Sequence, residues 1–198
     1  MFAYTFVQKT RFCFYVEKRL RNSYLKSFFW NKRNVSFEFN HPKNNTMLNL
    51  VRTDSKNPDF LKMVKELDQT LKVTDGDDHA FYNQFNALDR IKNVIVAYDS
   101  GIPVACGAFR EYGPRSVEIK RMYTKPLYRK RGYASAILEA LENWAIEIGY
   151  NKCVLETGIF QPPAIALYKK RQYDVIPNYG QYSGVGGSMC FLKYLAAS

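Results

Sequence analysis

The chain has 198 residues, of which 46% are hydrophobic, 24% charged and 16% aromatic. This length suits one globular domain with an appendage and is too short for two full enzyme domains. The composition excludes disordered, collagen-like and coiled-coil chains. Lys and Arg total 29 against 18 Asp and Glu, a net charge of +11. This excess favours an anionic partner but does not distinguish a nucleic acid, a membrane surface and a phosphorylated cofactor.

The four cysteines lie far apart and form no CxxC pair, so zinc-ribbon, haem-attachment and thioredoxin-like sites have no support. Cys106, Cys153 and Cys190 interrupt apolar runs, where cysteine is typically a small buried hydrophobe. No stretch approaches the roughly 20 apolar residues of a membrane-spanning helix, and the apolar run 12–16 is shorter than that of a secretion signal. We therefore expect a cytoplasmic protein with no metal and no membrane partner.

The charge is uneven and marks one boundary near Met47. Residues 1–46 contain 9 basic and 2 acidic residues, 12 aromatics and no glycine, and show no sustained periodicity, so they do not form a complete packing unit. They could be a targeting leader, a nucleic-acid or membrane-surface arm, or an upstream stretch translated from too early a start, and we favour the last. The expected domains are an N-terminal extension over 1–46, either not native or disordered, and a folded domain over 47–198.

The first half of that domain predicts a strand, two helices and a hairpin. Residues 48–51 alternate like a strand, and Asn57 and Pro58 supply an N-cap and a first helical position. The apolar stripe that follows predicts a helix to about Leu71. A second short helix is expected through Phe81, Phe85 and Leu88. Strands over 93–98 and 103–109 follow, joined by an Asp-Ser-Gly turn.

The second half predicts alternating strands and helices. Strands are expected over 116–124, 153–157 and 188–195, and helices over 133–148 and 163–171. The chain order therefore predicts a mixed α/β fold with no internal repeats.

The most informative stretch, residues 118–134, combines a strand, a basic loop with one glycine and the start of a helix. Free backbone N–H groups and the positive end of the helix dipole make an anion site there, and Gly132 allows the chain to approach a phosphate closely. Neither GxGxxG nor GxxxxGK[ST] is present, which disfavours dinucleotide and ordinary NTP sites. The pattern predicts a diphosphate-binding loop, although a solvated basic loop that caps a helix would look the same in isolation.

Arg129-x-x-Gly132-x-Ala134 resembles the Q/R-x-x-G-x-G/A acetyl-CoA signature of the GNAT superfamily of N-acetyltransferases, and the resemblance extends over about residues 50–195. Downstream, Glu156-Thr157-Gly158 and the segment 161–168 resemble the family's fifth strand and its A-x-x-L-Y helix. The resemblance implies the acyl-CoA N-acyltransferase fold, a mostly antiparallel sheet with flanking helices, and acetyl-CoA as co-substrate. It implies these cofactor-binding residues: Met122, Tyr123, Thr124, Arg129, Lys130, Arg131, Gly132, Tyr133, Ala134, Ser135 and Gln161.

An aliphatic amine has a pKa near 10, so only about one molecule in a thousand is nucleophilic at neutral pH, which costs roughly 4 kcal/mol. Glu118 matches the position where several family members carry a general-base glutamate. It could instead be a surface carboxylate paired with Lys120 or another basic neighbour, and a water chain could replace it as base.

Tyr168 matches the helix tyrosine that, in many family members, protonates the departing thiolate; the alternative is an aromatic that packs on the cofactor. A backbone N–H near Tyr123 would stabilise the oxyanion. Three residues depart from the family pattern: Gln161 stands where Asn is frequent, Gln172 replaces a glycine that is common in a turn, and Lys130 replaces a small residue.

The resemblance places the acceptor near the loops that hold Asp78, His79, Tyr179 and Tyr182. The acidic residues among them could equally cap a helix. We expect an acetyl-CoA-dependent N-acetyltransferase, a monomer or homodimer, that acts on an unidentified primary amine of a small molecule or peptide. The rivals are a basic nucleic-acid-binding module, which lacks a recognition motif, and a CoA-binding protein without turnover.

Overall fold

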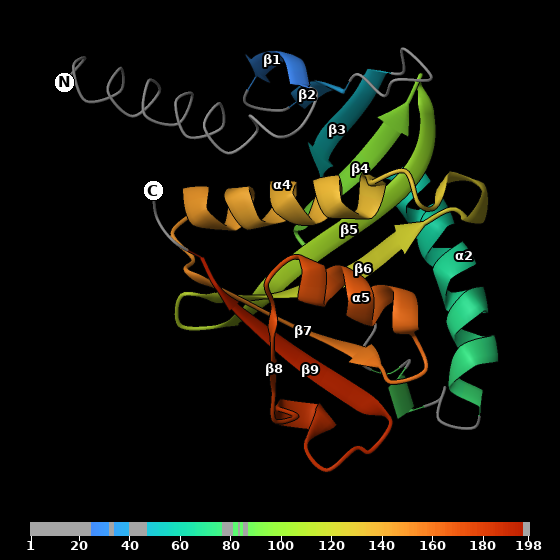
Figure 1. The fold of residues 1–198 in the computed structure, drawn as a ribbon, viewed down its shortest axis with the longest axis vertical. Coiled ribbons are helices and arrows are strands. Elements are labelled where there is room, and N and C mark those ends of the chain that lie inside the picture. Colours follow the sequence, from blue (N-terminus) through green and yellow to red (C-terminus); the bar gives the residue numbers. More distant parts are fainter. Residues whose placement is uncertain are drawn as a thin grey trace.

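The computed structural model describes residues 25–31, 34–39, 47–76, 81–82, 84 and 87–195. These residues form a nine-stranded sheet in the order β1-β2-β3-β4-β5-β6-β7-β9-β8 (Figure 1). Its strands are β1 (Leu25–Asn31), β2 (Asn34–Phe39), β3 (Met47–Thr53), β4 (Asn93–Asp99), β5 (Ile102–Gly113), β6 (Ser116–Thr124), β7 (Lys152–Gly158), β8 (Asp174–Ile176) and β9 (Ser188–Tyr194). The helices are α2 (Pro58–Asp75), α4 (Tyr133–Glu147) and α5 (Pro162–Lys170), with the 3-10 turns η2 (Pro126–Tyr128) and η3 (Gly180–Tyr182).

The predicted mixed α/β fold is confirmed, and β6 has the predicted bounds. Helix α2 continues past Leu71 to Asp75, and the short strand β8 was not expected. The second short helix, through Phe81, Phe85 and Leu88, lies largely outside the described residues. Two strands of the predicted extension, β1 and β2, pair with each other at one edge of the sheet. Strand β2 also pairs with β3. The domain boundary near Met47 stays a prediction.

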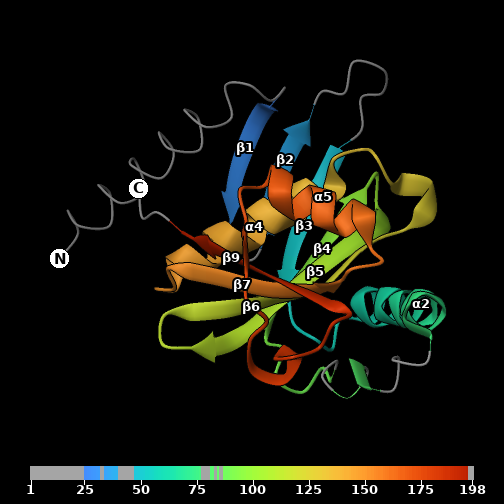
Figure 2. The same ribbon diagram turned by 60° about the horizontal axis from the view of Figure 1, so that its bottom comes forward.

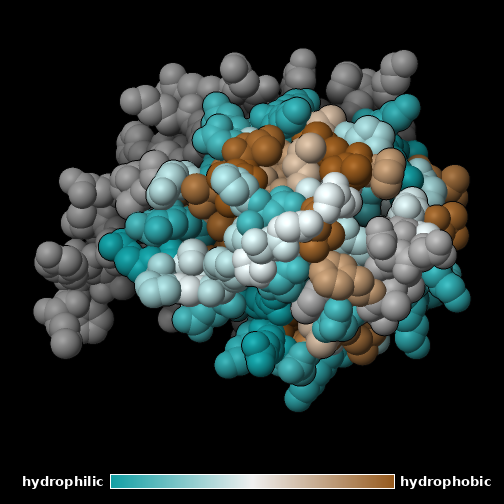
Figure 3. All heavy atoms as spheres, turned by 90° about the horizontal axis from the view of Figure 1, so that it is seen from below, coloured by the Kyte–Doolittle hydropathy of each residue, from teal (hydrophilic) through white to brown (hydrophobic). Residues whose placement is uncertain are grey.

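Helices cover both faces of the sheet, with α4 and α5 on one face and α2 on the other (Figures 1 and 2). Strand β4 contributes to the core on both faces of the sheet, because its residues alternate between the two layers. Ile95 packs under α4, while Val94 and Val96 pack against Phe60 of α2. A strand buried on both faces has no polar side and reads as a continuous apolar run. The lower surface mixes hydrophobic patches with hydrophilic residues and shows no single continuous apolar area (Figure 3).

Helix α5 ends in a turn that normally takes glycine. The Tyr173 N–H donates to the carbonyl of Tyr168 at 3.0 Å, and Gln172 between them has φ +63°. This arrangement is the Schellman motif, in which a residue in the left-handed region closes the helix. The departure noted from the sequence therefore coincides with a strained backbone.

We expect Gln172→Gly to raise the free energy of unfolding by about 0.5 to 1 kcal/mol. Glycine removes the steric strain of a side chain at positive φ, and this gain exceeds the conformational entropy that glycine adds to the unfolded chain. Gln172→Ala is the control, since it removes the same exposed side chain but keeps a Cβ. Urea unfolding measures both variants. An equal change in the two would contradict this account.

Candidate functional site

Strands β6 and β7 pair over a short length and then separate. Among the described residues, β6 and β7 form the one parallel pair, and all other neighbouring strands are antiparallel. Its partners are Ser116 with Lys152, Val117 with Cys153 and Glu118 with Val154. Beyond Glu118, β7 pairs with β9 as far as Gly158, while β6 continues beside β5 to Thr124. The facing backbone groups of β6 and β7 are therefore left for another partner.

A bulge in β6 accompanies this separation. The ladder with β5 runs from Cys106 opposite Tyr123 to Ala108 opposite Lys120, so two residues of β6 face Gly107. One of these is Arg121, with φ +57°. A bulge bends its strand and reverses which face later side chains take. In a regular strand, Lys120 and Tyr123 would face opposite sides of the sheet because they are three residues apart. The bulge between them places both side chains on the α2 side.

The bulge needs a glycine opposite it. A Cβ at Gly107 would lie 2.4 Å from Sδ of Met122 and 2.7 Å from Cγ2 of Ile137. Such contacts are closer than real Cβ atoms allow, so a side chain here would displace either the bulge or α4.

A cavity of about 110 Å³ lies between the separated strands. Both strands contribute to its wall, together with α2, α5 and η3. Four of the predicted site residues line it: Met122, Gln161, Tyr168 and Tyr182. Other lining residues were not among the predicted site residues, including Lys120 and Glu156.

The basic loop leads from β6 into an uncapped helix. Gly132, with φ +86°, precedes α4, and no side chain caps the first turn. Arg129 donates to the carbonyl of Thr124 at 3.2 Å, and Arg131 lies 5.3 Å from the ring centroid of Tyr128. Of the four cations in the loop, Arg129, Lys130 and Arg131 are exposed and Lys125 is half-buried; Lys130 has φ +63°. Free amides beside clustered cations fit an anionic ligand such as a diphosphate.

Tyr133, the first residue of α4, directs its side chain into the core. Its hydroxyl donates to Asp99, and burial together with this hydrogen bond raises the pKa of Tyr133 to about 12. At this position only the backbone amide is available to a ligand in the loop. The neighbouring predicted residues Ala134 and Ser135 lie in the same uncapped first turn.

Tyr168 is buried and borders the cavity, and its role as a proton donor or as an aromatic that packs on the cofactor stays a prediction. Its ring packs against Tyr173 and Phe191, with centroids 5.9 and 5.7 Å away, and it also lines the cavity. Burial, followed by the nearby charge of Glu156, raises the pKa of the Tyr168 phenol. The hydroxyl is therefore protonated at neutral pH.

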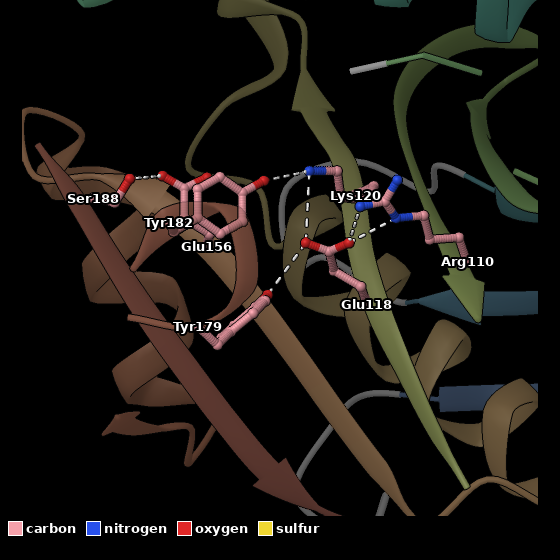
Figure 4. A network of polar contacts seen from close by, with 7 residues as sticks. All are labelled: Arg110, Glu118, Lys120, Glu156, Tyr179, Tyr182 and Ser188. Atoms are coloured by element: carbon pink, nitrogen blue, oxygen red, sulfur yellow. Dashed lines mark hydrogen bonds and ion pairs between the residues drawn. The ribbon is translucent and has the colours of Figure 1, made fainter. Parts of the chain in front are cut away.

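Glu118 is fully buried at the centre of a polar network (Figure 4). Arg110 donates to its carboxylate from Nε at 2.7 Å and contacts it from Nη2 at 2.6 Å. The Tyr179 hydroxyl donates to the other oxygen at 3.2 Å, and Nζ of Lys120 lies 3.7 Å from that oxygen. The expected pairing with a basic neighbour is present, but the carboxylate is not on the surface. Glu118 does not line the cavity directly and reaches it through Lys120 and Tyr182.

A second carboxylate, Glu156, borders the cavity itself and accepts a hydrogen bond from Oγ of Ser188 at 2.8 Å (Figure 4). The sequence contained a signal for it. Glu118 pairs with Val154, and Glu156 lies two residues further along β7, hence on the same face. The parallel register, which the sequence does not state, was needed to use that signal.

The late loop brings two of the predicted acceptor residues to the same place. Tyr179 and Tyr182 pack edge to face, with ring centroids 5.7 Å apart, and Tyr112 packs on Tyr179 at 4.9 Å. Burial, then the charge of Glu118, raises the pKa of both loop phenols. The other two predicted acceptor residues, Asp78 and His79, lie outside the described residues.

Comparison with known proteins assigns the family. Residues 60–173 match the Acetyltransferase (GNAT) family, and the chain belongs to this family. An IAA acetyltransferase of Azospirillum brasilense is 36% identical over 93 residues, which are 44% of this chain and 58% of that protein. YjgM of Escherichia coli, described as an uncharacterized N-acetyltransferase, is 28% identical over 112 residues, 56% of this chain and 60% of that protein. The chain thus matches less than two thirds of the length of either relative.

Solved structures share the fold. A Klebsiella pneumoniae protein described as an acyl-CoA N-acyltransferase has a TM-score of 0.64 and 25% identity, covering 75% of this chain and 98% of that one. The PaiA N-acetyltransferase of Thermoplasma acidophilum, solved with coenzyme A, has a TM-score of 0.56 and 14% identity, covering 74% and 98%. The likeness to both structures supports the acyl-CoA N-acyltransferase fold predicted from the motifs.

Two further observations concern the part of the chain that the structure describes. It contains no cluster of three or more His, Cys, Asp or Glu side chains arranged to hold a metal ion. Its helices are all too short or too polar to cross a lipid bilayer.

We expect Gly107→Ala to lower the free energy of unfolding by about 1 to 3 kcal/mol, because the new methyl group overlaps Met122 and Ile137. Gly113→Ala on the same strand is the matched control, since its Cβ would meet nothing closer than 3.5 Å. Urea unfolding of both variants provides the measurement. Equal destabilisation of the two would show that the close contact opposite the bulge is unimportant.

Proposed function

We propose that the protein transfers an acetyl group from acetyl-CoA to a primary amine of a small molecule or peptide, by direct attack in a ternary complex. The observation that carries this proposal is the cavity between β6 and β7, together with the loop that leads from β6, through three exposed cations, to the uncapped start of α4. Membership of the acetyltransferase family supports it. No covalent enzyme intermediate is needed, because the amine meets the thioester in the cavity.

In this proposal the diphosphate of acetyl-CoA binds the amides of residues 131–135, assisted by Arg129, Lys130 and Arg131. The pantetheine arm follows the unpaired edge of β6 at Met122–Thr124, and Gln161 at the start of α5 borders its far end. These are the groups that the chain leaves without ladder or capping partners, which supports their use by a ligand.

Tyr168 is the proposed proton donor to the departing thiolate. Because burial raises the pKa of the Tyr168 phenol, the hydroxyl carries a proton at neutral pH, which it can share in a hydrogen bond with the sulfur as negative charge develops there. Its place on the cavity wall supports this role.

The buried carboxylate of Glu118 and the half-buried carboxylate of Glu156 suit different tasks. Glu118 contacts Arg110 and lies 3.7 Å from Nζ of Lys120, so it can receive a proton that leaves the cavity through Lys120 and Tyr182. We therefore propose Glu118 as the general base. Glu156 borders the cavity directly and would attract the cationic form of the acceptor amine. Tyr179 and Tyr182 would help to bind the acceptor. Together with Glu118, Lys120 and Glu156 they form what we call the acceptor face.

Gly132→Glu tests the diphosphate site. The variant places a carboxylate against the phosphates, and we expect calorimetry to detect no binding of coenzyme A. Gly149→Glu is the control at the opposite end of α4, since Gly149 also has positive φ and nothing within 4 Å of its Cβ. It should bind coenzyme A normally. Unchanged affinity in Gly132→Glu would refute the mapping.

Glu118→Gln and Glu156→Gln separate the two carboxylates. Release of the coenzyme A thiol is followed across a panel of amines, peptides and aminoglycosides, which also separates an enzyme from a protein that only binds coenzyme A. We expect Glu118→Gln to lower kcat about 100-fold at neutral pH and less at high pH, where free amine is abundant. Glu156→Gln should mainly raise KM for the amine. A pH-independent loss in Glu118→Gln with a pH-rescued loss in Glu156→Gln would assign the base to Glu156.

A further inference from the structure

We propose that Lys120 is itself an acetyl acceptor, so that the protein acetylates its own cavity wall when no amine substrate is bound. The proposal rests on the proposed function, because the acetyl donor must enter the cavity between β6 and β7. It assigns a modification site to a side chain that the proposed transfer uses to pass a proton from the cavity to Glu118.

The geometry points to Lys120 because of its place at the bulge. It directly precedes Arg121 of the bulge, and it lines the same cavity as Met122 and Tyr168. The side chain is only 10% exposed, and Nζ donates to the Tyr182 hydroxyl at 3.0 Å (Figure 4). Under the proposed function, a thioester held along Met122–Thr124 has this amine as a neighbour on the cavity wall.

The surroundings of Lys120 also favour the uncharged amine. Burial is the main cause that lowers the pKa of Lys120. The positive charges of Arg110 and Arg121 act in the same direction, and those of Glu118 and Glu156 oppose them. The net lowering means that more of this side chain is nucleophilic at neutral pH than in an exposed lysine.

The reaction balances without any reactant other than acetyl-CoA. The neutral Nζ attacks the thioester carbonyl, an N–C bond forms, and the C–S bond breaks. The proton lost by nitrogen passes to the carboxylate of Glu118, 3.7 Å away, and one proton is returned to the leaving sulfur from Tyr168. The products are an Nε-acetyl-lysine and the free thiol of coenzyme A.

Acetylation would change the acceptor face. The amide carries no charge and one N–H donor in place of three, so Glu118 would retain Arg110 but lose its second cationic neighbour. The acetyl group would also occupy part of a cavity of about 110 Å³. We therefore expect the modified protein to turn over amines more slowly than the unmodified one.

The test is to incubate the full chain with acetyl-CoA and no amine, and to follow each lysine by peptide mass spectrometry. Lys193 is the matched control, because its side chain is equally buried, at 10% exposure, and pairs with Glu142 at 2.6 Å outside the cavity. Exposed Lys62 on α2 reports chemical acetylation by free acetyl-CoA. We expect Lys120 to react at least about tenfold faster than Lys62, saturably in acetyl-CoA, and Lys193 to stay unmodified.

Two variants sharpen the test. Gly132→Glu should abolish the reaction at Lys120 while leaving Lys62 unchanged, and Lys120→Arg should remove the rapid phase of acetyl incorporation. Continued acetylation of Lys120 in Gly132→Glu, or equal rates at Lys120 and Lys62, would overturn the inference. If the protein binds coenzyme A and acetylates an amine while Lys120 stays unmodified, only this inference fails. If coenzyme A does not bind at all, the proposed function fails with it.

Discussion

The separation of β6 from β7 is the constraint on which the rest of the structure depends. A sheet gains stability by pairing every inner strand, yet these two strands share only three pairs of residues before they diverge. The bulge at Arg121 and the missing side chain at Gly107 make the divergence compatible with a packed core. Because α4 follows β6 and α5 follows β7, both helices begin beside the opening. The cavity and the helix N-terminus that could hold a long anionic thioester therefore arise from one irregularity in the sheet.

Charge balance is the second feature of the site. Glu118 is paired with Arg110 from the neighbouring strand β5 and lies near Lys120 on its own strand, while Glu156 accepts a hydrogen bond from Ser188. A buried charge is tolerated when a partner and hydrogen bonds compensate for lost hydration. The buried carboxylate of Glu118 therefore depends on its two cations, and removal of either one would weaken the compensation of its charge. Membership of the acetyltransferase family gives this arrangement its functional setting.

The sequence predicted what is local and missed what depends on contacts across the sheet. The strand, loop and helix over 116–147 were predictable because they follow one another directly in the chain, so their pattern can be read from one continuous segment. Strand β8 has three residues, too few for a periodic signal, and β1 and β2 have no clear alternation. The burial of Glu118 could not be foreseen, since the contact with Tyr179 joins residues 61 apart. Turn chemistry was partly readable, because Gln172 stands at a position that favours glycine.

A crystal structure of the protein soaked with coenzyme A tests the central claim most directly. The account predicts the diphosphate within hydrogen-bond distance of the amides at the start of α4, and the pantetheine arm between β6 and β7 along Met122–Thr124. Coenzyme A bound elsewhere, with β6 and β7 still apart and the cavity between them unfilled, would contradict it.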